Sequence, residues 1–255
     1  MGRYKQLMKK IDIHEKLIEA GIDISYPTVC NYIRENHEKK EAFIRQEYKL
    51  GETLEFDWGE VKLTIAGKPI TLQMGLLTTA CGSHHYARLY QNQKMENFLD
   101  IHVQAFNNMG GVHRELVYDN LKQAVRKFVG RNEKEATEDL IKISLYYGFK
   151  YRFCNIASGN EKGHVERGIE YVRRKAFSFR TKFDTLEEAN AYLKKKLLEL
   201  NSKKRNWLQN QSPLDILKQE MAYLIPLKPS YDASRRVEAR VNKYSVINID
   251  QNKYS

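Results

Sequence analysis

Three acidic side chains lie in sequence contexts that can support metal chemistry. Asp57 lies inside the apolar segment LEFDWGE, where a carboxylate is costly unless a partner, a metal ion or solvent compensates it. Asp119 follows the apolar segment LVY, and Glu166 lies about one turn into the helix expected over KGHVERGIEYVRR. Because Asp57 and Asp119 are 62 positions apart and Asp119 and Glu166 are 47 apart, only folding can bring the three together.

Carboxylates on two neighbouring strands and a helix can hold two Mg²⁺ ions roughly 4 Å apart, with Mn²⁺ as a substitute. Mg²⁺ takes hard oxygen ligands in octahedral geometry, which carboxylates, water and a phosphate supply. One ion can activate an attacking water or 3′-hydroxyl while the other stabilises the leaving oxygen. The basic side chains Lys122, Lys162 and Arg167 are expected to hold a DNA backbone beside this site.

Each acidic residue taken alone has an ordinary explanation. An Asp-Asn pair at the end of a strand is typical of a turn, and isolated carboxylates are commonly solvated. The metal-site prediction therefore depends on the three residues together and on their order.

The segments around these residues predict an α/β fold, in which a mixed sheet is flanked by helices. Residues 51–120 are rich in β-branched and aromatic residues, and Ala66-Gly67-Lys68 supplies a turn between two strands. The expected elements are strands at 54–65, 69–79, 86–90 and 115–118, a helix over 94–109, a helix over 135–147, a strand at 150–154, a helix over 162–180 and further helices from 185 to about 225.

Residues 1–50 predict two helices with a turn at Gly21 between them, the second helix capped by Ser25. This arrangement fits either a DNA-binding helix-turn-helix or a plain helical hairpin. In the first case the second helix presents three polar residues to a major groove: Thr28, Asn31 and Arg34. Val29, Tyr32 and Ile33 are expected to form a helical stripe in this segment.

Charge is unevenly distributed along the chain. The net charge is +11 overall, +2 over residues 1–50, −3 over residues 51–120 and +12 over residues 121–255. Carboxylates between basic flanks suit metal chemistry on a phosphate backbone. On the basic helix, Arg173 and Arg174 are expected to contact phosphate, although a solvated helix face is the alternative. Three widely separated cysteines predict reduced thiols, and no apolar run is long enough to cross a bilayer.

The segments FDWGE, VYDNLKQAV and KGHVERGIEYVRR resemble, in order, the three acidic motifs of IstA-type insertion-sequence transposases. This family belongs to the superfamily of DDE transposases and retroviral integrases. The resemblance implies an RNase H-like catalytic core with Asp57, Asp119 and Glu166 as catalytic and metal-binding residues, and two Mg²⁺ ions. It also implies double-stranded DNA as substrate, at transposon ends and at the target, together with a homo-oligomer and an ATPase helper protein.

On these grounds we expect a helix-turn-helix segment with its linker at 1–50, a catalytic core at 51–182, a helical extension at 183–229 and the start of a truncated C-terminal β-barrel at 230–255. The expected function is a DNA transposase, a DDE-type polynucleotidyl transferase, that cuts transposon ends and joins them to target DNA. The alternatives are an RNase H-like nuclease and a catalytically inactive DNA-binding regulator. The expected location is the bacterial cytoplasm, in association with the nucleoid and without a membrane partner.

Overall fold

The fold is described from a computed structural model of the 255-residue chain. The structure describes residues 10–36, 48–119, 121–128, 134–154, 159–234, 241, 245–249 and 252–254. The backbone contacts divide the chain into two compact units, Met1–Gln46 and Glu47–Ser255.

The first unit contains two helices, α1 (Lys10–Glu19) and α2 (Tyr26–Asn36). Gly21 ends the first as predicted: its φ of +79° allows its amide to donate to the Ile18 carbonyl at 2.9 Å. Ser25 caps the second helix, because its hydroxyl accepts a hydrogen bond from the Thr28 amide at 3.3 Å. The predicted stripe lies on α2, and its members differ in exposure. Val29 is buried, whereas Tyr32 is 65% exposed.

A sheet in the order β3-β2-β1-β4-β7 is the centre of the second unit. The strands β1, β2 and β3 are antiparallel, while β4 and β7 add in parallel to β1. A short strand, β8, pairs in parallel with the far end of β1. The bounds are β1 Thr53–Ile65, β2 Lys68–Thr79, β3 His85–Tyr90, β4 Glu115–Tyr118, β7 Lys150–Phe153 and β8 Lys182–Phe183.

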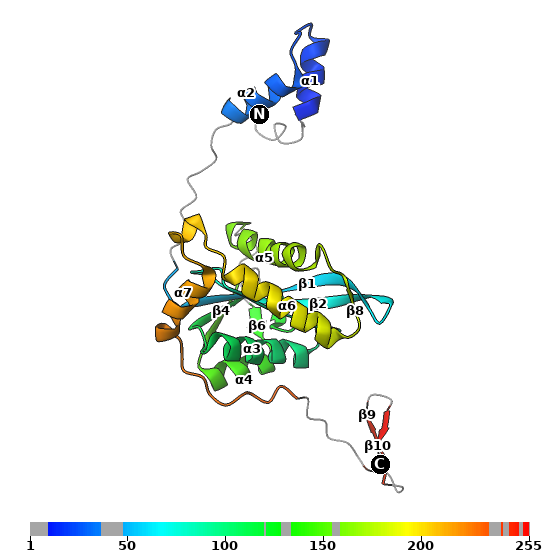
Figure 1. Ribbon diagram of the computed structural model, residues 1–255, viewed down its shortest axis with the longest axis vertical. Coiled ribbons are helices and arrows are strands. Elements are labelled where there is room, and N and C mark those ends of the chain that lie inside the picture. The colour runs from blue at the N-terminus through cyan, green and yellow to red at the C-terminus, as the bar shows by residue number, and fades with distance from the viewer. Residues whose placement is uncertain are drawn as a thin grey trace. The chain divides into compact units, whose positions relative to one another are not determined.

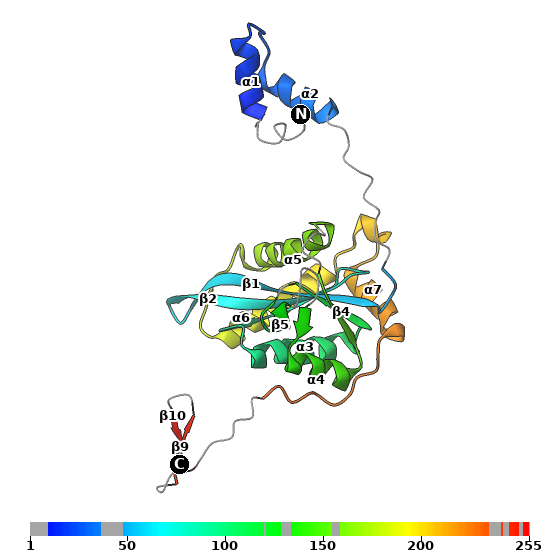
Figure 2. The same cartoon turned by 180° about the vertical axis from the view of Figure 1, so that it is seen from behind.

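Helices cover both faces of this sheet, so the predicted mixed sheet flanked by helices is confirmed. One face packs against α3 (Met95–Met109) and α4 (Glu138–Tyr147), and the other against α5 (Gly159–Phe177) and α6 (Leu186–Asn201). Both views of the ribbon show the sheet between these two helical layers (Figures 1 and 2). Because β1 contributes alternate residues to each layer, Phe56 belongs to the α3 side and Val61 to the α5 side.

Both helices predicted in the middle of the chain are present, but their predicted boundaries are wrong. The helix expected over 135–147 begins only at Glu138, because Thr137 caps it and the preceding residues form a hairpin of β5 (Val125–Phe128) and β6 (Lys134–Ala136). The helix expected over 162–180 spans Gly159–Phe177, so it ends three residues earlier than predicted. Residues 178–181 then lead into β8, where the Thr181 carbonyl accepts a hydrogen bond from the Thr64 amide.

The C-terminal part is helical up to residue 223, as predicted. After α6 come a short 3₁₀ helix (Asn206–Leu208), α7 (Pro213–Glu220) and a second 3₁₀ helix (Met221–Tyr223). Ser212 and Asp215 form a capping box at the start of α7, where Pro213 occupies the first turn. The strands β9 (Ile247–Ile249) and β10 (Asn252–Tyr254) pair as a hairpin. In the part of the chain described, every helix is too short or too polar to cross a membrane.

Candidate active site

Asp57 and Asp119 lie on adjacent parallel strands. The register pairs Phe56 of β1 with Tyr118 of β4, so the next position on each strand places Asp57 beside Asp119. Asp57 lies within the long strand β1, whereas Asp119 directly follows the last residue of β4. Both residues are half-buried. The structure thus brings the first two predicted carboxylates to neighbouring positions.

An aromatic cluster lies on the opposite face of the sheet, beneath the two aspartates. Because side chains alternate along a strand, the residues directly before the aspartates, Phe56 and Tyr118, point into the core on the α3 side. Both are fully buried, and their ring centroids are 5.9 Å apart. They pack with Phe98 and His102 of α3. Rigid rings therefore fix the backbone at each aspartate.

His102 of α3 makes two buried hydrogen bonds, one within the helix and one to the end of β4. Its Nδ1 lies 2.6 Å from the Phe98 carbonyl oxygen, which can only accept, so Nδ1 carries the proton. Its Nε2 is therefore an acceptor, and it lies 2.9 Å from the Tyr118 hydroxyl, which donates. Burial lowers the pKa of His102 to about 4 and raises the pKa of Tyr118 well above its ordinary value. The pair is therefore neutral at physiological pH.

Helix α5 approaches the sheet face that carries the aspartates at a position where β1 has no side chain. A Cβ on Gly59 would lie 2.2 Å from Ile169 Cγ2, so only glycine allows this approach. Further along, the guanidinium of Arg173 donates a hydrogen bond to the Glu60 carbonyl at 3.2 Å. The C-terminal end of α5 thus lies toward Glu60 and its N-terminal end toward Asp57. Glu166 is three residues before Ile169 on this helix.

The turn after Asp119 is fixed by backbone and side-chain hydrogen bonds. The Leu121 amide donates to the Asp119 carbonyl at 2.7 Å. The Gln123 side chain donates to the Gln93 carbonyl, and the Thr137 hydroxyl donates to the Gln123 carbonyl at 2.7 Å. These contacts attach the turn to the loop before α3 and to the cap of α4. Lys122 is exposed on the same turn.

The structure describes the other predicted residues to different extents. The side chains of Glu166, Lys162, Arg167 and Arg34 lie outside the described residues, although their helices are placed. Thr28 and Asn31 are exposed on α2. Arg174 is exposed on α5, and Arg173 is exposed but also bonded to β1. Arg173 therefore has a structural contact in addition to any contact with phosphate.

The donor set of this site fits a divalent cation. Two carboxylates at neighbouring positions offer the hard oxygen ligands that Mg²⁺ takes. Among the described residues, no three His, Cys, Asp or Glu side chains converge into a metal-binding group. The side chain of Glu166, the predicted third ligand, lies outside the described residues.

Comparison with known proteins finds transposases that are similar to this chain. The chain is 28% identical to a transposase for insertion sequences IS1326/IS1353 from Pseudomonas aeruginosa, over 98% of this chain and 52% of that protein. It is 26% identical to a transposase for insertion sequence element IS21 from the same organism, over 79% of this chain and 52% of that protein. The chain is similar in sequence to insertion-sequence transposases. It spans about half the length of the curated relatives that it matches.

Two further comparisons concern parts of the chain. Residues 1–41 match the family described as Mu-like transposase middle domain. The fold is similar to the HTLV-2 integrase catalytic core domain in complex with magnesium, with a TM-score of 0.51 and 13% identity over 67% of this chain and 99% of that one. The BIV integrase catalytic core domain gives a TM-score of 0.50 and 14% identity over 68% and 97%. The predicted RNase H-like fold is thereby confirmed.

Sequence reasoning missed the residues that hold the aspartates in place. The dipeptides Phe56-Asp57 and Tyr118-Asp119 both put an aromatic residue before the acid, and this shared pattern was the available signal. The contact between Gly59 and Ile169 joins residues 110 positions apart, and nothing local indicates it.

Proposed function

We propose that the chain is the catalytic part of a DNA transposase, a DDE-type polynucleotidyl transferase. Asp57, Asp119 and Glu166 are its catalytic residues in this proposal. The observation that carries it is the parallel register of β1 and β4, which puts Asp57 beside Asp119 on the sheet face covered by α5. The similarity to insertion-sequence transposases over 98% of the chain supports the same reaction class.

The three carboxylates would hold divalent metal ions, two Mg²⁺ in the full proposal, with Mn²⁺ as a substitute. Bound there, such ions supply an activated oxygen nucleophile and stabilise the leaving oxygen at a phosphodiester. The chain's own residues position the DNA around them. Lys122 on the turn after Asp119, with Lys162, Arg167 and Arg174 on α5, would contact the phosphate backbone.

The first unit would recognise the transposon end. Its second helix exposes Thr28 and Asn31, and Arg34 lies on the same helix. These residue types donate hydrogen bonds to base edges and phosphates in the major groove. The remaining partners in this proposal are target DNA, further copies of the chain and an ATPase helper, and the place of action is the nucleoid in the bacterial cytoplasm.

A strand-transfer assay tests the proposal. Wild-type chain and Asp119→Asn are incubated with labelled DNA duplex carrying the element's ends, in Mg²⁺ or Mn²⁺ and in EDTA. We expect joined products with metal only, and none from the variant, because the amide loses a charged metal ligand while phosphate contacts remain. Cleavage without joining would favour a nuclease instead. DNA binding without any metal-dependent chemistry would favour a regulator, and normal activity in the variant would contradict the assignment of Asp119.

A further inference from the structure

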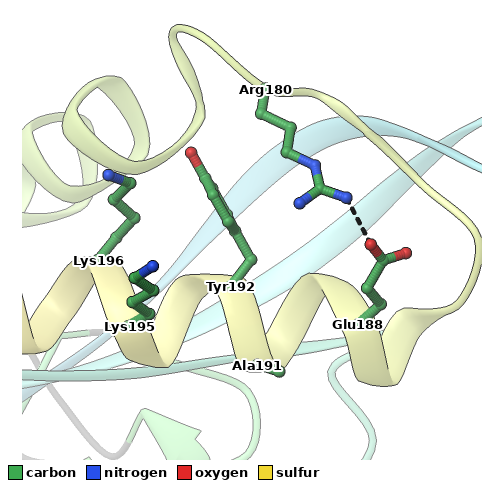
Figure 3. Close-up of a pocket in the computed structure, with 6 residues that line it drawn as sticks. All are labelled: Arg180, Glu188, Ala191, Tyr192, Lys195 and Lys196. Atoms are coloured by element: carbon green, nitrogen blue, oxygen red, sulfur yellow. Dashed lines mark hydrogen bonds and ion pairs between the residues drawn. The ribbon is translucent and has the colours of Figure 1, made fainter.

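A basic hollow lies between α6 and the segment that links α5 to β8 (Figure 3). It has a volume of about 380 Å³, and we call it the α6 hollow, defined by Arg180, Glu188, Ala191, Tyr192, Lys195 and Lys196. The lysines and Tyr192 project from α6, while Arg180 reaches over from the segment between α5 and β8 (Figure 3). We propose that the α6 hollow binds the phosphate backbone of duplex DNA, as a second DNA contact outside the catalytic site. This rests on the proposed function.

The cations of the hollow are arranged around one aromatic ring. The guanidinium carbon of Arg180 lies 5.3 Å from the centroid of the Tyr192 ring, and Lys196 Nζ lies 5.7 Å from the same centroid. The Tyr192 ring packs on Phe183, with centroids 5.4 Å apart, and Phe183 is buried. A ring anchored in the core orders the cations on either side of it, which lowers the entropy lost when they bind an anion.

Two acidic residues orient this site without neutralising it. Glu188 forms a salt bridge with Arg180 and accepts a hydrogen bond from the Asp184 amide at 2.7 Å. Because its carboxylate is held at both ends, Glu188 fixes the position of the Arg180 guanidinium. Glu199 forms a salt bridge of 2.8 Å with Lys196. In the part of the chain described, Lys195 forms no salt bridge and is exposed. Residues 173–207 contain 11 basic and 4 acidic side chains, so the surroundings are strongly positive.

The position of the hollow suits a duplex that also reaches the aspartates. Lys182, two residues after Arg180, pairs with Thr64 of β1, and Asp57 is seven residues earlier on that strand. At roughly 3.3 Å per residue, this separation is roughly 23 Å along the sheet. DNA rises 3.4 Å per base pair, so a duplex cut at Asp57 would reach this end of the sheet about seven base pairs away. Phe179, directly before Arg180, is 100% exposed and offers a flat apolar surface to the same partner.

The test measures duplex binding by the full chain in EDTA, where no metal-dependent chemistry takes place. The variant Lys195→Gln/Lys196→Gln removes two charges and keeps polar side chains at both positions. The matched control, Lys142→Gln/Lys218→Gln, removes two exposed charges on α4 and α7. Affinity for a 30-base-pair duplex is measured by fluorescence anisotropy at several salt concentrations, with thermal melts to verify folding.

We expect the hollow variant to bind about tenfold more weakly at low salt. Its slope of log affinity against log salt should fall by about two, because each lost phosphate contact removes about 0.9. The control should keep the wild-type slope. An unchanged slope in the hollow variant overturns the proposal. Pyrophosphate binding is measured in parallel. If the wild type binds pyrophosphate, the hollow variant does not, and duplex binding is unchanged, the hollow is a site for small phosphates instead.

The two proposals fail in different ways. If the α6 hollow does not bind DNA, its variant binds like the control while Asp119→Asn still abolishes cleavage. If the chain is not a transposase, the wild-type protein gives no metal-dependent products. The hollow variant still shows a smaller slope of log affinity against log salt than the control.

Discussion

The contact between Gly59 and Ile169 predicts that one methyl group on β1 disturbs the site from a distance. In Gly59→Ala the new Cβ would lie 2.2 Å from Ile169 Cγ2, whereas carbon atoms pack at about 3.5–4.0 Å. Helix α5 must therefore move away from β1 by about 1.5 Å. A 1 Å misplacement of catalytic groups can cost about 100-fold in rate. Overpacking of this kind destabilises a fold by about 1–3 kcal/mol.

We therefore expect Gly59→Ala to unfold at lower denaturant and to cleave DNA about 100-fold more slowly, with DNA binding in EDTA nearly unchanged. Gly75→Ala is the matched control, because its Cβ would meet Ile101 and Trp58 at 3.1 Å on the opposite face of the sheet. It should lose stability without a comparable loss of cleavage. Unfolding curves and single-turnover cleavage rates of both variants give the comparison.

A second substitution tests whether the clash itself is the cause. Ile169→Ala removes Cγ2 and should restore much of the cleavage of Gly59→Ala, so the double variant is better than the sum of the single effects. Ile169→Val keeps Cγ2, the atom that clashes, and should restore little. Wild-type cleavage by folded Gly59→Ala, or equal rescue by Ala and Val, would refute the argument that this contact sets the position of α5.

Two further predictions concern the buried histidines. Tyr118→Phe leaves His102 Nε2 without its hydrogen-bond donor, so we expect the free energy of unfolding to fall by about 1–2 kcal/mol. We also expect half-maximal cleavage to need several-fold more Mg²⁺. Calorimetric Mg²⁺ binding equal to that of the wild type would contradict this second expectation. Burial lowers the pKa of His84 to about 3 and of His85 and His102 to about 4, so the unfolded chain binds protons first as pH falls below 6.5. The free energy of unfolding should be highest above pH 6.5. Toward pH 4 it should fall, for each of these histidines, by roughly 1.4 kcal/mol per pH unit. A constant free energy of unfolding in denaturant titrations from pH 7 to 5 would count against this prediction.

Local patterns in the sequence were sufficient to predict the strands that carry Asp57 and Asp119. Alternating apolar residues define β1 and β2, and the turn at Gly67, with φ +77°, joins them. The helix over 94–109 followed from the spacing of its apolar residues and the glycine at 110, whose φ is +76°. These features depend on residues close together in the sequence, which is why they were predictable.

The errors occurred where tertiary contacts decide the structure. Ala136 has helical spacing with Leu140 and Ile143, so the local pattern alone permits a helix that begins at 135. In the structure Ala136 pairs with Val125, and the Thr137 amide donates to the Ala124 carbonyl at 2.9 Å. These hydrogen bonds to a segment about 12 residues earlier hold the residues extended, and local helix propensity cannot reveal them.

Within the site, too, some positions depend on strand pairing and others on tertiary packing. The separation of Asp57 and Asp119 depends on one strand pair, and adjacent strands lie roughly 4.8 Å apart whatever their side chains. A buried aromatic residue before each aspartate then fixes the backbone from below. The position of Glu166, by contrast, depends on α5, which is held at β1 by the space above Gly59 and the bond from Arg173 to Glu60. Substitutions along α5 should therefore affect the third carboxylate without moving the first two. For this reason Arg173 is a poor choice for testing phosphate contact, because its loss changes the helix position as well as the charge.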